Sequence, residues 1–231
     1  MSLTVKICGV RTVHHARIAA EAGADFVGLV FAPSRRRVTP AEAREITGAT
    51  YTRTRRPRFV GVFVNGDPDE VARVAGAARL DLAQLSGSES PEECARLRVP
   101  YTKVAHVHAE MTAADVLHII NQYPDVVGFV LDAMGGSQSS SYKESGSEGE
   151  GDSPWGGTGA TIDWGLAAEV ARRAGKPVTL AGGLRPETVS EAVRVARPWG
   201  VDVSSGVETG GVKDDEKIRA FIDAAKGVVL A

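Results

Sequence analysis

Short apolar segments alternate with longer segments of helical spacing along the chain. The apolar segments are rich in Val, Leu, Ile and Phe, which favour buried strands. Eight of them occur, each followed by one helix candidate: Leu3 to Cys8, Asp25 to Phe31, Phe59 to Val64, Leu80 to Leu85, Thr102 to Val107, Val126 to Asp132, Val178 to Ala181 and Val201 to Ser204. This alternation predicts an α/β protein with a parallel sheet covered by helices.

Start signals support three of the helices. A proline in the first turn costs a helix no hydrogen bond. The signals predict helices over Asp69 to Arg79 after Asp67-Pro68, Glu92 to Arg98 after Ser90-Pro91, and Glu187 to Ala196 after Pro186.

Eight βα units in 231 residues match the size of a (βα)8 TIM barrel. We therefore predict a single domain over residues 1–231, built on a closed, parallel, eight-stranded sheet. A doubly wound open sheet is the alternative, but it usually has fewer strands and a glycine-rich phosphate turn after the first strand. Here that turn is Cys8-Gly9-Val10. In a barrel, chemistry is expected at the carboxyl ends of the strands.

One segment, Ser137 to Pro154, interrupts the alternation. It is dominated by Ser, Gly and Glu and offers no apolar face, so we expect a mobile insertion whose removal leaves the fold stable. It follows the sixth strand, at the predicted mouth of the barrel. A lid is one interpretation, and a solvated insertion without function is the one we prefer.

Charge and composition narrow the class of partner. The chain carries 27 basic and 29 acidic side chains, a formal net charge of −2, without the basic excess of nucleic-acid-binding proteins. We find no apolar run of membrane-spanning length and no signal-peptide pattern, so we expect a cytoplasmic protein with a small-molecule partner. The two cysteines and five histidines lack metal-ligand spacing, and we assign none of them to a metal.

Glycines and small hydroxyls gather after the last two strands. Backbone N–H groups converge on an anion where no Cβ blocks the approach, and TIM barrels often bind phosphate between these two loops. Tight turns are the alternative, but two such loops on adjacent strands favour phosphate. The predicted binding residues are Gly182, Gly183, Ser204, Ser205 and Gly206, with Gly157 and Gly159 as a weaker addition.

Two strand ends carry reactive side chains. Alternation along the first strand turns Thr4, Lys6 and Cys8 into the barrel, where a cation such as Lys6 would favour the Cys8 thiolate. For Cys8, a reactive thiol and an inert, buried thiol remain equally open interpretations. Cys94 lies in a helical pattern, which fits an inert thiol. Asp132 ends the sixth strand facing inward, where burial can raise its pKa toward that of a general acid. A helix cap is the alternative, but little helical pattern follows.

A basic cluster, Ser34-Arg35-Arg36-Arg37, follows the second strand. An arginine there can pair with a carboxylate or phosphate through two hydrogen bonds. A solvated, charged turn is the ordinary interpretation for at least two of the three.

An ordered set of motifs resembles phosphoribosylanthranilate isomerase over essentially the whole chain except the insertion. Single motifs are weak, and their joint order and spacing are specific. The set is Lys6-Ile7-Cys8-Gly9, Gly23-Ala24-Asp25, Gly28, Phe31, Ser34, Arg36, Val38, Val60 to Asn65, Gln84-Leu85, Leu131-Asp132, Gly156 to Gly159, Asp163-Trp164, Leu180 to Leu184 and Gly200 to Glu208.

The resemblance implies an aldose–ketose isomerase (an intramolecular oxidoreductase) of tryptophan biosynthesis. It would convert N-(5-phosphoribosyl)anthranilate to 1-(o-carboxyphenylamino)-1-deoxyribulose 5-phosphate by an Amadori rearrangement. It assigns Asp132 as the acid that opens the ribose ring, Cys8 as the base at C2 and Arg36 as the anthranilate-binding arginine. The imine is the electron sink, so no cofactor is expected.

The family commonly has His where this chain has Ser86. Association with pathway enzymes or a homodimer is compatible with the sequence. Two other functions are rivals to this one. A histidine-pathway aminoaldose isomerase would have Asp at Cys8 and a second phosphate site. A catalytically idle barrel that binds a phosphometabolite would not need both Cys8 and Asp132.

Overall fold

The eight predicted strands form a closed barrel. A computed structural model describes residues 3–50, 56–133 and 161–229 of the chain. The strands are β1 (Thr4–Ile7), β2 (Phe26–Val30), β3 (Arg58–Phe63), β4 (Leu82–Leu85), β5 (Tyr101–Val107), β6 (Gly128–Ala133), β7 (Val178–Leu180) and β8 (Gly200–Val203). Neighbours pair in parallel around the ring, and β8 closes against β1 with Lys6 beside Asp202.

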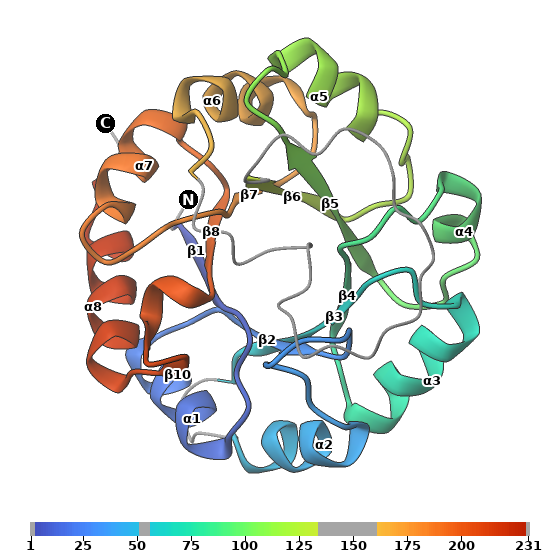
Figure 1. Ribbon diagram of the computed structural model, residues 1–231, viewed down its shortest axis with the longest axis vertical. Coiled ribbons are helices and arrows are strands. Elements are labelled where there is room, and N and C mark those ends of the chain that lie inside the picture. The colour runs from blue at the N-terminus through green and yellow to red at the C-terminus, as the bar shows by residue number, and fades with distance from the viewer. Residues whose placement is uncertain (1–2, 51–55, 134–160, 230–231) are drawn as a thin grey trace.

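Helices surround this barrel on its outside (Figure 1). They are α1 (Val13–Ala22), α2 (Pro40–Ala49), α3 (Pro68–Ala78), α4 (Pro91–Ala95), α5 (Ala113–Ile120), α6 (Trp164–Arg173), α7 (Val189–Ala196) and α8 (Asp215–Lys226). A short antiparallel hairpin, β9 (Glu208–Thr209) with β10 (Val212–Lys213), leads from β8 to α8. The predicted TIM-barrel fold is confirmed, as is the alternation of strands and helices that predicted it.

The barrel has two apolar regions. The larger lies between strands and helices, where Val5 and Ile7 of β1 pack with Ala16 of α1 and Phe221 of α8. Burying a side chain of this size contributes roughly 1.5–3 kcal/mol, so this outer layer dominates the stability. The smaller region, inside the barrel, consists of Val104, Val130 and Ala181. Its small size leaves room at the mouth for polar side chains.

Two of the three predicted helix starts are confirmed. Asp67 caps α3 with its carboxylate, and Ser90 caps α4 in a reciprocal capping box with Glu93. The third is wrong by two residues, because α7 begins at Val189 rather than Glu187, and Thr188 makes no side-chain cap bond. The end predicted for the second helix is also wrong: α4 ends at Ala95, not Arg98. After Ala95 the chain makes tighter turns, in which the Arg96 N–H donates to the Glu93 carbonyl and the Leu97 N–H to the Cys94 carbonyl.

The insertion Ser137 to Pro154 lies outside the described residues. No helix among the residues that are described combines the length and the apolar character needed to cross a membrane.

Candidate active site

The thiol predicted at the end of β1 lies inside the barrel mouth. Cys8 is 9% exposed, and its backbone N–H donates to the Val203 carbonyl of β8. A Cβ at Gly28 of β2 would lie 2.7 Å from the Cys8 sulfur and 3.1 Å from the Lys6 Cε. Glycine at position 28 therefore provides the space in which the thiol and the lysine lie side by side.

A buried polar network crosses the barrel below the thiol. The Lys6 ammonium donates to Asp202 Oδ2 of β8 at 2.6 Å and to Gln84 Oε1 of β4 at 2.9 Å. Burial opposes the charge on Lys6, but Asp202 and Cys8 outweigh it and raise the lysine pKa. Lys6 is therefore a fixed cation, held by groups from two other strands, β4 and β8.

Burial and charge compete at Cys8. Burial raises the pKa of the thiol above its ordinary value, and Asp202 adds to this effect. Lys6 and Lys213 act in the opposite direction. The expectation that Lys6 favours the thiolate has the right sign, but burial is the larger effect.

The carboxyl group of Asp132, at the end of β6, stays protonated to a higher pH than usual. Burial is the main cause and the negative charge of Asp202 the second, and together they raise the pKa of Asp132 to about 6. A Cβ at Gly182 would meet the Ala133 backbone at 2.8 Å and the Asp132 Oδ1 at 3.2 Å. Gly182, with φ at +82°, thus lets the loop after β7 run close to this carboxyl group.

Cys8 and Asp132 come from opposite parts of the ring. Their strands are separated by β7 and β8 on the shorter route. Each interacts with Lys6 and Asp202, so the polar network connects the two groups electrostatically. That they face each other with room for a sugar between them stays a prediction.

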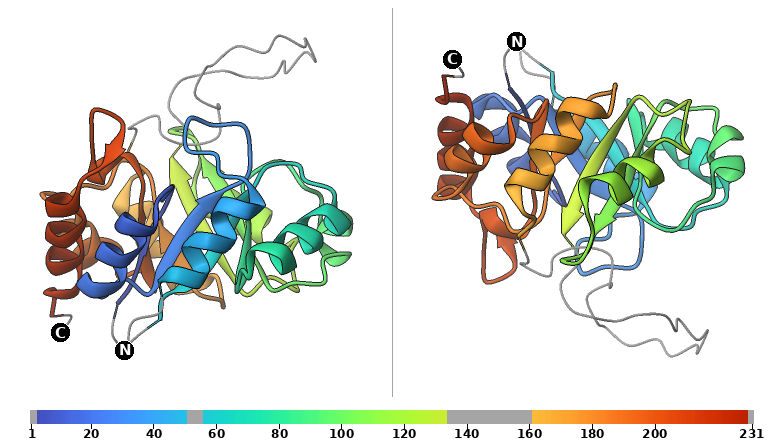
Figure 2. Two further views of the ribbon diagram at one scale, coloured as in Figure 1. Left: turned by 90° about the horizontal axis from the view of Figure 1, so that it is seen from below. Right: turned by 90° about the horizontal axis from the view of Figure 1, so that it is seen from above.

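The predicted carboxylate-binding arginine is buried and oriented. Arg36 is 7% exposed and pairs with Glu208 through two bonds, Nε to Oε1 at 2.8 Å and Nη2 to Oε2 at 2.9 Å. The Lys213 ammonium donates to the same Glu208 Oε1 at 2.7 Å. Figure 2 shows the loop after β2 and the β9–β10 hairpin at the same end of the barrel.

This arginine lies across the loop that follows β1. A Cβ at Gly9 would lie 2.5 Å from Arg36 Cδ, and Gly9 also has φ at +72°. Arg36, Glu208 and Lys213 line a pocket of about 270 Å³ together with Gly9 and His15. Arg35, by contrast, has a side chain that is 48% exposed.

The predicted phosphate loops form one wall of a second pocket, of about 540 Å³. Gly183, Ser205 and Gly206 line it, and a Cβ at Gly206 would lie 1.9 Å from the Leu184 carbonyl oxygen. Among the described residues, the N–H groups of Gly183 and Ser205 donate to no backbone oxygen. Such N–H groups are available to an anion.

Two residues of the predicted phosphate set have other surroundings. Gly182 lies against Asp132, and Ser204 accepts from Lys213 through its carbonyl oxygen at 2.8 Å. Neither lines the pocket, whereas Arg185 and Lys217 do. Sequence reasoning missed these two cations because a basic residue before α7 and another in the first turn of α8 carry no distinctive pattern. Gly157 and Gly159 lie outside the described residues.

Ser86, which stands where the family commonly has His, lies beside an imidazole from the next strand, that of His106. The Ser86 hydroxyl accepts from the Gln84 amide at 3.3 Å, which ties it to the Lys6 network. The ring Nε2 of His106 lies 2.9 Å from the Ser86 carbonyl oxygen, and His106 is in register with Asp132. Burial lowers the His106 pKa, so this imidazole is neutral at pH 7.

Comparison with known proteins agrees with this geometry. A family model described as N-(5'phosphoribosyl)anthranilate (PRA) isomerase matches residues 5–224. N-(5'-phosphoribosyl)anthranilate isomerase from Roseiflexus sp. (strain RS-1) is 43% identical over 228 residues, covering 97% of this chain and 98% of the relative.

Solved structures give the same result. Dimeric phosphoribosylanthranilate isomerase from Thermotoga maritima, crystallised as monomers, superposes with a TM-score of 0.77 at 34% identity, covering 98% of this chain and 100% of that one. A phosphoribosyl anthranilate isomerase in complex with reduced 1-(o-carboxyphenylamino)-1-deoxyribulose 5-phosphate has a TM-score of 0.77 at 33% identity, with the same coverage. The chain therefore belongs to the N-(5'-phosphoribosyl)anthranilate isomerase family.

Proposed function

We propose that this chain catalyses the Amadori rearrangement of N-(5'-phosphoribosyl)anthranilate in tryptophan biosynthesis. Family membership supports the reaction. The observation that carries the mechanism is the presence, at one barrel mouth, of a carboxyl group with a pKa of about 6 and a thiol beside a buried lysine.

The acid step uses Asp132. Its carboxyl group gives a proton to the ribose ring oxygen as the C1–O bond breaks, and the anilino nitrogen lone pair forms the C1=N iminium. A positioned acid with a pKa near 6 keeps useful proton content near neutral pH while remaining a good donor. The resulting carboxylate is stabilised by Lys6, which favours the charged form of Asp132.

The base step uses Cys8. Its thiolate removes the C2 proton, the C2–H electron pair forms the C1=C2 bond, and the iminium nitrogen becomes neutral. The enol-amine then takes a proton at C1 and loses one from the C2 hydroxyl to give the ketone. Lys6 and Lys213 stabilise the thiolate. The C2–H electrons remain in the product, so the overall step is redox-neutral and proceeds with the chain's own acid and base.

Binding is assigned to Arg36 and to the loops after β7 and β8. Arg36, whose Nε and Nη2 donate to Glu208, is proposed to bind the anthranilate carboxylate. Gly183, Ser205 and Gly206 offer backbone donors for the 5-phosphate, with Arg185 and Lys217 beside them. Gly157 and Gly159 belong to the same proposal on their sequence motif alone.

The setting follows from the same proposal. Both cysteines are free, as expected for a reducing cytoplasm. We further propose that residues 1–231 act as one barrel domain, which associates as a homodimer or with pathway enzymes. The dimeric Thermotoga maritima relative supports a homodimer.

The direct test is a fluorescence assay. Purified protein mixed with freshly made phosphoribosylanthranilate should abolish the fluorescence of that substrate at a rate proportional to enzyme concentration, and Asp132→Asn should slow it. A parallel assay with the histidine-pathway aminoimidazole substrate separates the rival enzyme. Turnover of that substrate alone would overturn the assignment, and turnover of neither would favour an idle binding barrel.

A further inference from the structure

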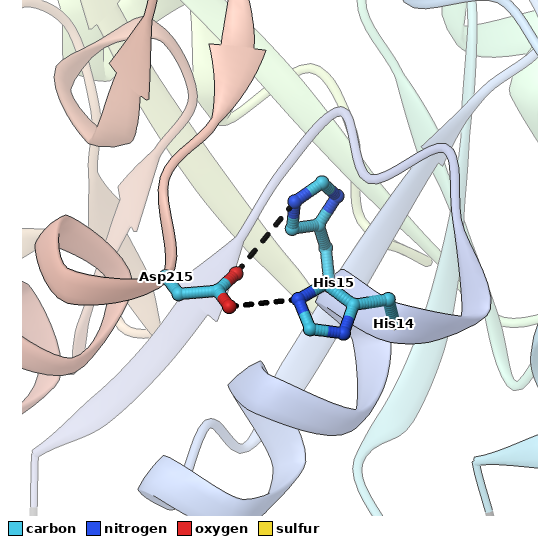
Figure 3. Close-up of side chains that lie close together, drawn as sticks. All are labelled: His14, His15 and Asp215. Atoms are coloured by element: carbon cyan, nitrogen blue, oxygen red, sulfur yellow. Dashed lines mark hydrogen bonds and ion pairs between the residues drawn. The ribbon is translucent and has the colours of Figure 1, made fainter.

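Two histidines and one aspartate converge outside the catalytic pair. His14 and His15 lie in the first turn of α1, and Asp215 is the first residue of α8 (Figure 3). His14 Nε2 is 2.7 Å from Asp215 Oδ2, and His15 Nε2 is 3.7 Å from Asp215 Oδ1. One ligand atom from each residue lies within 4.8 Å of the other two, an arrangement that no other His, Cys, Asp or Glu group in the described residues reaches.

A neighbouring hydroxyl orients the more buried imidazole. Thr12 Oγ1 lies 2.8 Å from His15 Nδ1, while the His15 side chain is only 14% exposed. A metal ligand of this kind typically donates its second ring N–H to an oxygen, which fixes the tautomer and the ring plane. With the proton on Nδ1, Thr12 accepts it, and Nε2 is left with a lone pair 3.7 Å from an oxygen of the Asp215 carboxylate. A cation between this lone pair and the carboxylate would bind both.

Charged groups around the cluster act on a bound cation in both directions. Against a cation stand Lys213 and the positive ends of α1 and α8. The carboxylates of Asp214, Asp215 and Glu216 at the start of α8 oppose these positive charges. The balance predicts weaker binding than in a closed, four-ligand structural site.

We propose that His14, His15 and Asp215 form a binding site for a divalent transition-metal ion, best matched by Zn²⁺. Two imidazoles and one carboxylate are a ligand set that zinc uses, and the fourth position is left to water. Sequence spacing cannot reveal this site, because its ligands lie about 200 residues apart and are joined only by barrel closure.

The ion would clamp the first helix to the last. Its position matters because His15 also lines the pocket that contains Arg36 and Lys213. Zinc binding would therefore fix the loop after β1 and the β9–β10 segment against each other at the mouth. The inference does not depend on the proposed isomerase activity.

The test is a titration of untagged protein with ZnCl2, followed by calorimetry and by melting temperature. We expect one saturable site and a melting temperature that rises with zinc concentration, because the ligand binds the folded state. His14→Ala and Asp215→Asn should each weaken binding at least about tenfold, a loss of about 1.4 kcal/mol. His118→Ala, which removes an exposed imidazole on α5, is the matched control and should bind as the wild type does.

Two further variants separate alternatives. Thr12→Val should weaken zinc binding about tenfold by removing the orienting oxygen, and Thr12→Ser should restore it. Cys8→Ser should leave zinc binding unchanged. The proposal is overturned if the wild type shows no saturable site, if His14→Ala binds normally, or if Cys8→Ser alone abolishes binding and so assigns the ion to the barrel mouth.

Discussion

The two proposed proton-transfer groups follow non-neighbouring strands, β1 and β6, and burial has opposite consequences for them. At the β6 side, burial and Asp202 keep Asp132 protonated up to a pKa of about 6, which suits an acid. At the β1 side, burial and Asp202 raise the Cys8 pKa, which disfavours the thiolate that a base requires. Only the β1 side has two cations, Lys6 and Lys213, that act against this effect.

The order of the two pKa values has a kinetic consequence. The reactive form has Asp132 protonated and Cys8 ionised, although Asp132 loses its proton at lower pH than Cys8 does. The reactive form is therefore a minor species at every pH, in constant proportion between the two pKa values. Burial therefore favours the protonated acid at Asp132 directly, whereas the base at Cys8 depends on the fixed positive charges of Lys6 and Lys213.

The largest effects are expected from removing either group. Cys8→Ser and Asp132→Asn should each lower kcat by about 10² to 10⁴, the usual contribution of a positioned acid or base. Binding of the reduced product analogue should persist in both, because neither variant removes Arg36 or the phosphate loops. Near-normal turnover of Cys8→Ser would show that another group is the base.

The pH profiles of kcat/KM sharpen the same comparison. For the wild type, the rate should rise with pH to about 6, where Asp132 begins to lose its proton, and then level until the thiol ionises. The residual activity of Asp132→Asn should continue to rise to the Cys8 pKa, since only the thiol still titrates. Cys8→Ser should lose the thiol-dependent rise.

The next largest difference between the two sides is expected in the pH dependence of stability. The folded pKa of Asp132 is about two units above its ordinary 3.8, so the folded state binds more protons between these values. Stability from this group is therefore lost as pH rises through about 6, by as much as about 3 kcal/mol. Asp132→Asn should be more stable than wild type at pH 8 and nearly equal to it at pH 4 in urea unfolding.

Cys8→Ser is the control for that experiment. The thiol stays largely protonated in both states from pH 4 to 8, because its ordinary pKa of 9.0 lies above this range and burial raises it further in the folded state. Its difference from wild type should not change over this range. Parallel curves for Asp132→Asn would mean that Asp132 is ionised in the folded state from pH 4 upward.

The next effect concerns binding rather than proton transfer. Arg36→Ala should raise KM about tenfold or more with a smaller change in kcat, since the anthranilate carboxylate is bound in ground and transition states alike. A charged hydrogen bond contributes about 1.5–3 kcal/mol. Arg35→Ala is the matched control, because its more exposed guanidinium reaches the same Glu208 at 3.2 Å. Equal losses in the two variants would refute the assignment of Arg36.

Sequence reasoning predicted what is local and missed what barrel closure creates. The eight strands were found within about two residues, since buried strands leave continuous apolar runs. Strand alternation also turned Cys8 and Asp132 inward. It could not reveal the pairing of Lys6 with Asp202, 196 positions away, or the contact of Arg36 with Glu208, 172 positions away. The α7 start was misjudged because a proline signals a first turn without specifying its cap.

The smallest expected effects are displacements of the pH profile, and they separate the two sides most finely. Asp202 raises the pKa of both Cys8 and Asp132. Asp202→Asn should therefore move both breaks in the kcat/KM profile to lower pH. Lys213 lowers the pKa of Cys8 and does not contribute at Asp132, so Lys213→Gln should move only the thiol break, to higher pH.

Both variants disturb a buried ion pair, so circular dichroism must first show that each is folded at the assay temperature. Breaking such a pair can cost about 3–5 kcal/mol. Within folded protein, the direction of each displacement is independent of the lost stability, because it depends only on the sign of the charge removed. A Lys213→Gln profile in which the break near pH 6 moves as well would mean that the two sides share one electrostatic environment, and the asymmetry between the acid and the base would have to come from the substrate.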